Sequence, residues 1–555
     1  MYTFNEAFAS ILHFQIFPAG PQCLSRLALL FLLSSAFHLG ITPGITILDI
    51  NVLTAKYSCI KEAKALCSTL RNADAEVAER VLRLDNSLIR FTHGVNFLNG
   101  IQDIMDEDHK ETHAQTLYVL LGKLQAVVTT LKGLLKQPHD DSSLKTKKIK
   151  YAWKKENLDK AIDEVVLWQT TADQSYFLIM RMADRGVDNA LSECDSDARS
   201  STAVSIQSAI KIRAGLKAED TSNMNNKSGT GLTLPSTALD SMDITAIPYC
   251  DGMLIARRVF SDCRTTTYIL NRIQCLVASR EESLKKNARD LVRKLQHDEP
   301  HTFGVLQCKG CILPSSRASA EITLVFRHPK GASHPKSLRE FLLTSPAISL
   351  SQRIGIAKDL AKSVGYVHTF GFVHKNVRPE SFIIFETSNG RSGFLAGFEE
   401  FRKDEGWTHR RGDDAPTKNL YRHSSRQGTN PQEDFVMQHD IYSLGVCLLE
   451  IGLWGSFVQY SSAQAAPKLA ALLDVPLNIA APQTSTFLMQ HGKDHLLSLA
   501  ESQLPARMGD HFSEIVRTCL TCLDPDNEDF GNADEFEDED GIRVGARYIE
   551  KVSFD

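Results

Sequence analysis

The chain has 555 residues, which is too long for one hydrophobic core, and the usual domain size of roughly 100–200 residues predicts two to four folding units. With 43% apolar and 23% charged residues, its composition is typical of a soluble globular protein and excludes a largely disordered or fibrous chain. The formal net charge of -5 gives no overall sign of nucleic-acid binding, so we expect protein partners and no nucleic acid.

The first 48 residues form an apolar segment. Leu27 to Ile41 carry no formal charge, but this run is shorter than the ~20 residues that a spanning helix needs. The first basic residue is Arg26, which argues against a signal peptide. The pattern favours a buried or membrane-touching helix over a span, and a wrongly assigned start codon stays open as a third reading.

Residues 49–193 have the periodicity of an all-α helical bundle. Between Ala75 and Ala190 apolar residues recur at helical spacing, for example along Leu117–Leu135, Val77–Leu98 and Ala152–Trp168. We expect breaks at Gly94 or Gly100, at Pro138–Asp141 and near Thr171–Asp173, giving antiparallel neighbours joined by short connections. A lysine cluster between Lys145 and Lys155 either meets an anionic lipid surface or is a solvated helix start, and the second reading is favoured.

Three segments of this half resemble the HeLo-type helical domain of fungal proteins, a family that includes the HET-s prion-inhibition proteins. They are Asn72–Val81, Lys154–Ile162, and Trp168 followed by Ser175–Met180. The resemblance implies a module that disrupts membranes or self-assembles in fungal programmed cell death. A linker rich in Ser, Thr, Asn and Gly follows over residues 194–242, with one amphipathic stretch around Ala203–Leu216.

The second half, residues 243–555, resembles a protein kinase. A helix end, His374-Lys375-Asn376, and then Arg378-Pro379-Glu380-Ser381 leading into a strand are similar to the kinase catalytic loop H-R-D-x-x-x-x-N. Gly397-Phe398-Glu399 stands where kinases have D-F-G, and Asp440–Glu450 resembles the buried helix after the activation segment. The resemblance implies an α+β bilobal domain, with an N-lobe at about 243–329 and a C-lobe at about 330–555.

The residues that would carry kinase chemistry are altered. Asn376 replaces the aspartate that accepts the proton of the substrate hydroxyl, and an amide has no useful basicity. Gly397 and Ser381 replace the two side chains that hold magnesium, which prefers hard oxygen ligands. We therefore expect no active catalytic residue, and we regard magnesium binding as doubtful while ATP binding stays open.

The predicted N-lobe lacks a GxGxxG phosphate loop, and no V-A-I-K lysine can be placed. Arg257, Arg258 or Arg272 could stand in for that lysine. A helix over Ser279–Gln296 is similar to the kinase αC helix, and Glu281 and Glu282 are either its ion-pair partners or an ordinary acidic first turn. The second reading is favoured.

Other positions look structural. His374 and Phe398 match residues that pack together in kinases, and Asp440 matches the residue that braces the loop from below. The end of the activation segment, Asn419–Gly428, has Ser424 where fungal HeLo-linked kinase-like proteins have proline. The acidic tract Asp524–Asp540 is predicted to be a solvated loop, and Arg543–Ile549 a strand that packs back on the domain.

The cysteines favour a reducing compartment. All 12 are scattered without the density of a disulfide-stapled domain, so we expect free thiols and a cytoplasmic protein that is recruited to membranes. The pairs Cys308/Cys311 and Cys519/Cys522 have CxxC spacing, but the second lies in a predicted helix, and we expect no metal site.

The sequence thus favours a non-catalytic signalling protein in which a kinase-like domain regulates a helical bundle. The bundle would act on an anionic membrane or on itself, and the kinase-like domain on protein partners. Two rivals stay open: an active kinase with unconventional catalytic residues, which would depend on Lys375 or Glu380, and a scaffold that binds no nucleotide.

Overall fold

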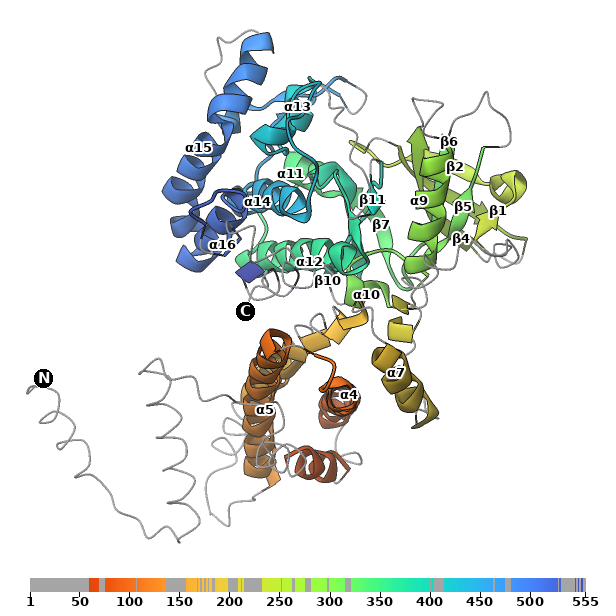
Figure 1. Cartoon of the computed structure of the whole chain (residues 1–555), viewed down its shortest axis with the longest axis vertical. Helices are drawn as coiled ribbons and strands as arrows, with labels where there is room; N and C mark the ends of the chain where they lie inside the picture. The colour runs from red at the N-terminus through yellow and green to blue at the C-terminus, as the bar shows by residue number, and fades with distance from the viewer. Residues whose placement is uncertain are drawn as a thin grey trace, which may run out of the picture.

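The computed structural model describes residues 59–68, 75–105 and 107–135, most of 156–213 and of 232–530, and Gly545, Tyr548, Lys551 and Val552. The apolar segment 1–48 and the lysine cluster lie outside the described residues. Figure 1 shows two parts, a smaller helical one and a larger one that combines a sheet with helices. No helix among the described residues is long and apolar enough to cross a bilayer.

The helical part is built on two long helices, α4 (Ala75–Ile101) and α5 (Glu107–Leu135), as its apolar periodicity predicts. Helical residues 59–68 and 156–166 and the shorter η1 (Ile179–Arg181) and α7 (Arg185–Asp197) complete it. Of the two predicted break positions, Gly94 is wrong, because α4 continues through it, whereas Gly100 lies next to the helix end at Ile101. An isolated glycine lowers helix stability by only about 1 kcal/mol, which the buried face of a 27-residue helix can outweigh.

The larger part begins with a six-stranded sheet in the order β1-β5-β6-β4-β3-β2. Its strands are β1 (Thr233–Leu234), β2 (Asp243–Ala246), β3 (Met253–Val259), β4 (Thr265–Gln274), β5 (Cys308–Ile312) and β6 (Glu321–Arg327). Helix α9 (Glu281–Lys294) packs against β5 and β6. The sheet starts before the predicted boundary at Asp243, because β1 pairs in parallel with β5 and η2 (Ser236–Leu239) follows it.

The rest is mainly helical, and two long helices form its centre. Helix α12 (Leu350–Thr369) begins with a capping box at Ser349 and Gln352, and α14 (Met437–Leu453) is buried along its whole length. The other helices are α10 (Pro300–Phe303), α11 (Leu338–Thr344), α13 (Pro416–Asn419), α15 (Ala481–Met508) and α16 (Asp510–Leu520), with 3-10 turns η4 (Pro379–Ser381), η5 (Ser424–Arg426) and η6 (Ala471–Leu473).

Three small sheets join these helices. Strands β7 (Ser333–Ser337), β9 (Phe382–Thr387) and β10 (Gly390–Leu395) form one, and β9 and β10 are an antiparallel hairpin. The others pair β8 (Phe372–Val373) with β11 (Arg402–Lys403), and β12 (Val458–Gln459) with β13 (Lys468–Leu469). This sheet-then-helix arrangement is compatible with the bilobal domain that the sequence predicts.

The end of the chain packs back on the larger part, but not as the predicted strand. Tyr548 is helical and buried, and its hydroxyl donates a hydrogen bond to the carbonyl of Ala361 at 2.7 Å. A tyrosine whose polar end finds a backbone partner can be buried without leaving its hydroxyl unsatisfied. Most of the acidic tract lies outside the described residues.

Candidate functional site

The loop after β8 is held from below by Asp440, near the start of α14. The Asp440 carboxylate accepts hydrogen bonds from the backbone nitrogens of His374 and Lys375 at 2.7 and 2.9 Å, and contacts His368 Nε2 at 3.1 Å. Burial opposes its ionisation, but these hydrogen bonds and the neighbouring imidazoles outweigh burial and lower the pKa of Asp440. The buried carboxylate of Asp440 therefore holds the backbone of the loop, which is the structural role that the sequence predicts for this residue.

His374 is a fully buried, neutral histidine. Its Nδ1 accepts from the backbone nitrogen of Asn376 at 3.3 Å, so Nε2 carries the proton and donates it to the carbonyl of Ala396 at 2.9 Å. Its ring lies 4.7 Å from the Phe398 ring. Burial lowers the pKa of His374 to about 4. With both ring nitrogens used inside the protein, His374 joins the loop to the strand end and has no nitrogen left for a substrate.

Asn376, which the sequence matches to the catalytic base of kinases, uses both ends of its amide within the protein. Its Nδ2 donates to the carbonyl of Gly397 at 3.0 Å, while its Oδ1 accepts from Arg378 Nε at 2.7 Å. A neutral amide carries no basic lone pair on nitrogen. The side chain thus ties the loop to the Gly397 backbone instead of preparing a proton transfer.

Ser381 and Gly397, which the sequence matches to the metal-binding positions of kinases, do not fit magnesium. Ser381 Oγ lies 2.6 and 2.8 Å from the carbonyls of Asn376 and Arg378, and it accepts from the Arg378 nitrogen at 3.0 Å. Gly397 has φ +70°, and its carbonyl also accepts from the Glu399 nitrogen at 2.9 Å. Magnesium requires near-octahedral oxygen ligands. Here one side chain is turned into its own loop and the other is missing.

A buried asparagine of β4 reaches this site, and it is not among the predicted site residues. Asn271 is fully buried, and its Oδ1 accepts from the backbone nitrogen of Phe398 at 2.6 Å. Strand β4 lies between β3 and β6, which is where a kinase carries its V-A-I-K lysine. The available signal is the alternation of Ile269, Asn271 and Ile273 on one face of the strand, because a polar residue on a buried face needs a partner.

None of the three arginines suggested for the lysine position points to this loop. Arg257 and Arg258 are exposed, and Arg258 lies over the Phe260 ring. Arg272 pairs with Glu321 across the sheet at 3.5 Å. Because side chains alternate between the two faces of a strand, the inward position next to Arg272 belongs to Asn271. That expectation is therefore corrected.

The acidic residues of α9 are engaged within their own helix. Glu281 and Glu282 pair with Lys285 at 2.6 and 3.0 Å. The hydrogen bonds that the Lys285 ammonium donates to these two carboxylates raise its pKa. This is the geometry of an ordinary acidic first turn with i,i+3 and i,i+4 pairs, the reading that the sequence favoured.

Beside the loop lies a buried ion network centred on Arg339 of α11. Its guanidinium donates to both oxygens of Glu380, at 3.2 and 3.3 Å, and to Glu450 at 2.7 Å. Tyr460 also donates to Glu380, and Tyr421 donates to Glu450. Burial opposes ionisation of Glu380, but the charges of Arg339 and Arg378 prevail and lower its pKa. The Glu380 carboxylate is thus a structural partner of Arg339.

The two CxxC pairs consist of buried thiols. Burial raises the pKa of Cys308 to about 12 and that of Cys311 to about 11, and it raises those of Cys519 and Cys522 as well. Metal ligation needs the thiolate, which these environments disfavour. Among the described residues, no group of three or more His, Cys, Asp or Glu side chains could hold a metal ion.

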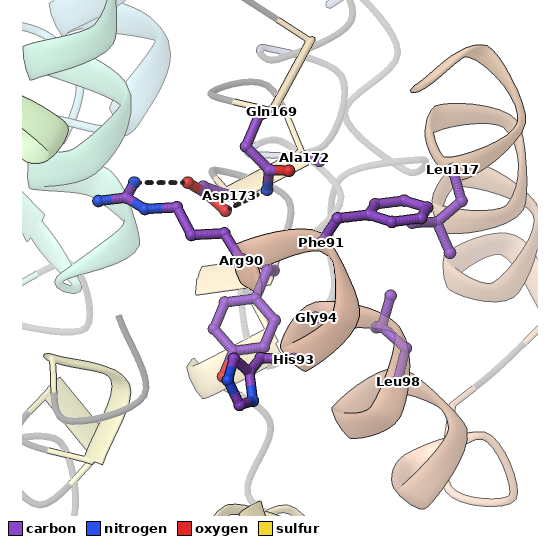
Figure 2. A pocket seen from close by; sticks show the side chains of 10 residues that line it. Arg90, Phe91, His93, Gly94, Leu98, Leu117, Gln169, Ala172 and Asp173 are labelled. Atoms are coloured by element: carbon purple, nitrogen blue, oxygen red, sulfur yellow. Dashed lines mark hydrogen bonds and ion pairs between the residues drawn. The ribbon is translucent and has the colours of Figure 1, made fainter. Parts of the chain in front are cut away.

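A second assembly of polar residues lies where the helical part meets the larger part. Arg90 of α4 pairs with Asp173 at 3.2 Å and with Glu299, just before α10, at 3.0 Å. Gln169 also donates to Asp173. Figure 2 shows Arg90 and Gln169 converging on Asp173 beside a small pocket. Burial raises the pKa of Asp173 to about 6.

Aromatic rings continue this junction. Phe177 of the helical part is fully buried, with its ring 5.0 Å from that of Phe303 and 6.0 Å from that of Tyr366. On its other side it contacts Tyr176, which in turn contacts Phe97 of α4. Edge-to-face ring pairs add about 0.5–1.5 kcal/mol each beyond area burial. The apolar cores of the two parts are therefore continuous.

No protein-family model matches the chain. A stretch of 118 residues is 31% identical to the rat protein "Eukaryotic translation initiation factor 2-alpha kinase 1". The matched stretch covers 19% of this chain and 18% of the rat protein, so most of either chain lies outside the match. Together with the sheet-and-helix architecture, this similarity supports a protein-kinase-like region in the chain.

Proposed function

We propose that this chain is a non-catalytic signalling protein in which a pseudokinase domain holds and regulates the helical bundle. The observation that carries the proposal is Asn376, which has an amide where a base is needed and uses both ends of that amide within the protein. General-base catalysis commonly contributes 10²–10⁴-fold to rate. The unsuitable metal positions Ser381 and Gly397 support the same conclusion.

The regulatory half of the proposal rests on the junction. Phe177 and Arg90 belong to the bundle, while Phe303, Tyr366 and Glu299 belong to the kinase-like part, and their side chains are largely buried together. A local change at Phe177 or Arg90 would weaken this contact. We propose that opening frees the bundle to act on an anionic membrane or to self-assemble. The resemblance of the bundle to HeLo domains supports a role in fungal programmed cell death as part of this proposal.

Catalytic inactivity is tested by incubating the purified full chain with labelled ATP, magnesium or manganese, and a general protein substrate. We expect no transfer above a no-enzyme blank, because neither a proton acceptor nor a metal site is formed. Transfer at an ordinary kinase rate that is lost in Asn376→Ala would support the rival view, an active kinase with unconventional residues. Loss in Glu380→Gln would be less informative, because Glu380 is a partner of the buried Arg339.

The regulatory part is tested by dye release from phosphatidylserine-containing vesicles. We expect little release with the full chain, more with Phe177→Ala, and the most with residues 1–193 alone. Tyr118→Ala is the matched control, because Tyr118 is an aromatic residue of the same part that is 55% exposed. If neither the fragment nor Phe177→Ala releases dye or forms larger assemblies, the bundle is not the acting part.

Nucleotide sensing is a separate question, and thermal shift assays with ATP answer it. Stabilisation by ATP with or without magnesium would make the kinase-like domain a nucleotide-responsive switch. An unchanged melting temperature would make it a scaffold. Because magnesium has no fitting ligands at Ser381 and Gly397, we expect any effect of ATP to be independent of the metal.

A further inference from the structure

The β2–β3 turn (residues 247–250) lies against the segments that follow the six-stranded sheet. The thiol of Cys250 donates a hydrogen bond to the backbone carbonyl of Glu380 in η4, with Sγ and O 2.9 Å apart. The hydroxyl of Ser337, the N-cap of α11, donates to the carbonyl of Pro248 at 3.0 Å. These two hydrogen bonds hold the turn on α11 and on η4, beside the altered loop.

Tyr249 adds a ring contact to these hydrogen bonds. Its ring packs edge-on against that of Tyr460, with centroids 5.0 Å apart, and the Tyr460 hydroxyl donates to the Glu380 carboxylate at 3.1 Å. The nitrogen of Cys250 donates to the carbonyl of Ile247 at 3.3 Å and closes the turn. Tyr249 has φ +59°, a left-handed conformation that residues other than glycine rarely adopt and that surrounding contacts must hold. The contacts of the turn therefore fix its conformation.

A second contact joins the sheet to the same loop. Asn271 of β4 accepts from the Phe398 nitrogen at 2.6 Å, and the Phe398 ring stacks on that of Phe326 in β6, with centroids 6.2 Å apart. In kinases the strand at the place of β4 carries the lysine that holds the ATP phosphates. Here Asn271 carries no positive charge, and its side-chain oxygen is used by the backbone after Gly397.

The β2–β3 turn stands at the place of the glycine-rich loop of kinases, which precedes the lysine strand and covers the ATP phosphates. It joins the two strands that come before β4 along the chain. Loops that cradle phosphates offer backbone N–H groups and positive charge, but none of residues 247–250 is charged. With Cys250 Sγ in contact with the Glu380 carbonyl, no atom of a ligand fits between these two groups.

We propose that the β2–β3 turn closes the nucleotide position of the kinase-like domain, so that this domain binds no ATP there and acts as a scaffold. The inference rests on the proposed function and favours a scaffold over a nucleotide-responsive switch. The turn also connects the sheet to the buried network, because Tyr460 and Arg339 both donate to Glu380. The sheet and the helices are thereby held together as one unit.

Hydrogen exchange of the full chain, followed by mass spectrometry of peptides that cover residues 244–254, tests whether the turn is held. We expect exchange about tenfold faster in Tyr249→Ala than in the wild type, because the ring contact is lost. Tyr249→Phe is the matched control, since it keeps the ring. Cys250→Ala and Cys250→Ser form a second pair, in which only serine keeps a donor for the Glu380 carbonyl. Equal exchange in the wild type, Tyr249→Ala and Cys250→Ala would overturn the inference.

Titration with ATP, with and without magnesium, tests the closed position itself. For the wild type we expect no heat of binding in calorimetry and no change in exchange at residues 244–254 or 372–381. ATP that binds and slows exchange at either segment overturns the inference, because the nucleotide then lies beneath the turn. ATP that binds and leaves both segments unchanged lies elsewhere and supports a closed position.

The phosphate-transfer and dye-release assays separate this inference from the proposed function. A chain that takes up ATP beneath the turn but transfers no phosphate would remain non-catalytic and would lose the scaffold assignment. A chain that binds no ATP and releases no dye would keep the closed turn and lose the proposed action of the bundle.

Discussion

At the scale of single residues, the chemistry of the loop is decided by close contacts around Gly397. A Cβ added there would lie 2.7 Å from Ser381 Cβ and 3.1 Å from its Cα, and the backbone has φ +70°. An aspartate introduced at Gly397 alone would therefore press against Ser381 in a left-handed backbone. Ser381 has a small side chain and Gly397 has none, so the two residues can lie close together.

We predict that Gly397→Ala destabilises the protein more than Gly331→Ala does. Both glycines have φ +70°, so both variants incur the conformational strain of a left-handed backbone, of order 1–3 kcal/mol. Nothing lies within 4 Å of a Cβ at Gly331, whereas Ser381 is in contact at Gly397, which should add about 1–3 kcal/mol of overpacking. Urea denaturation of the two variants measures the difference. Equal losses would show that the loop can move away from the added methyl group.

Asp173 should make stability depend on pH. Its pKa is raised from 3.8 to about 6, mainly by burial, so the folded protein holds this proton more tightly than the unfolded chain does. Stability from this group is complete below pH 4 and is lost as pH rises through 6, a change of about 2–3 kcal/mol. Asp173→Asn should remove this slope, as measured by denaturation at pH 4 to 7. A variant that keeps the slope would place its origin elsewhere.

At the scale of elements, the helices of the larger part are joined by the buried network around Arg339. This side chain comes from α11, Glu380 lies in η4, and Glu450 lies in α14. A buried ion pair adds little net stability when complete, but removing one partner leaves an uncompensated charge. The network therefore specifies how α11, the loop and α14 fit together, and it explains why Glu380 is unavailable for chemistry.

We predict that Arg339→Leu costs about 3–5 kcal/mol, because two buried carboxylates lose their common cation. Arg83→Ala is the control, since its partner Asp163 is 62% exposed and such surface pairs contribute about 0–1 kcal/mol. Thermal or chemical unfolding of each variant gives the comparison. A loss for Arg339→Leu as small as that for Arg83→Ala would mean that water enters and solvates both carboxylates.

At the scale of the whole molecule, the junction makes the helical part and the kinase-like part share one core. Its centre is Phe177, and at its edge two carboxylates, Asp173 and Glu299, share Arg90. Because Asp173 and Glu299 both pair with Arg90, the strength of the contact between the two parts depends on whether these carboxyl groups are ionised. The coupling between the two parts can therefore be followed through the titration of Asp173.

We predict that Glu299→Gln lowers the pKa of Asp173, because the negative charge of Glu299 disfavours ionisation of its neighbour. Carboxyl-selective NMR of the full chain measures it. Glu282→Gln is the control, since Glu282 is an exposed acid on α9 that pairs with Lys285. A pKa of Asp173 that is unchanged by Glu299→Gln would show that the two parts are not docked in solution.

The sequence by itself indicated the bundle periodicity, the order of kinase-like landmarks and the loss of the base at Asn376. These are local properties, because helical spacing and the identity of one side chain do not depend on distant contacts. It also indicated Asp440 as a brace, because that residue stands at a fixed place in a recognisable motif. The early start of the sheet at β1 was missed, since a two-residue strand has no pattern of its own.

Only the tertiary structure revealed which residues that are distant in sequence contact one another. Asn271 on Phe398, Arg339 between two glutamates, and Phe177 against Phe303 join positions far apart in sequence. Whether a polar side chain is buried, and what satisfies it there, depends on which elements pack around it.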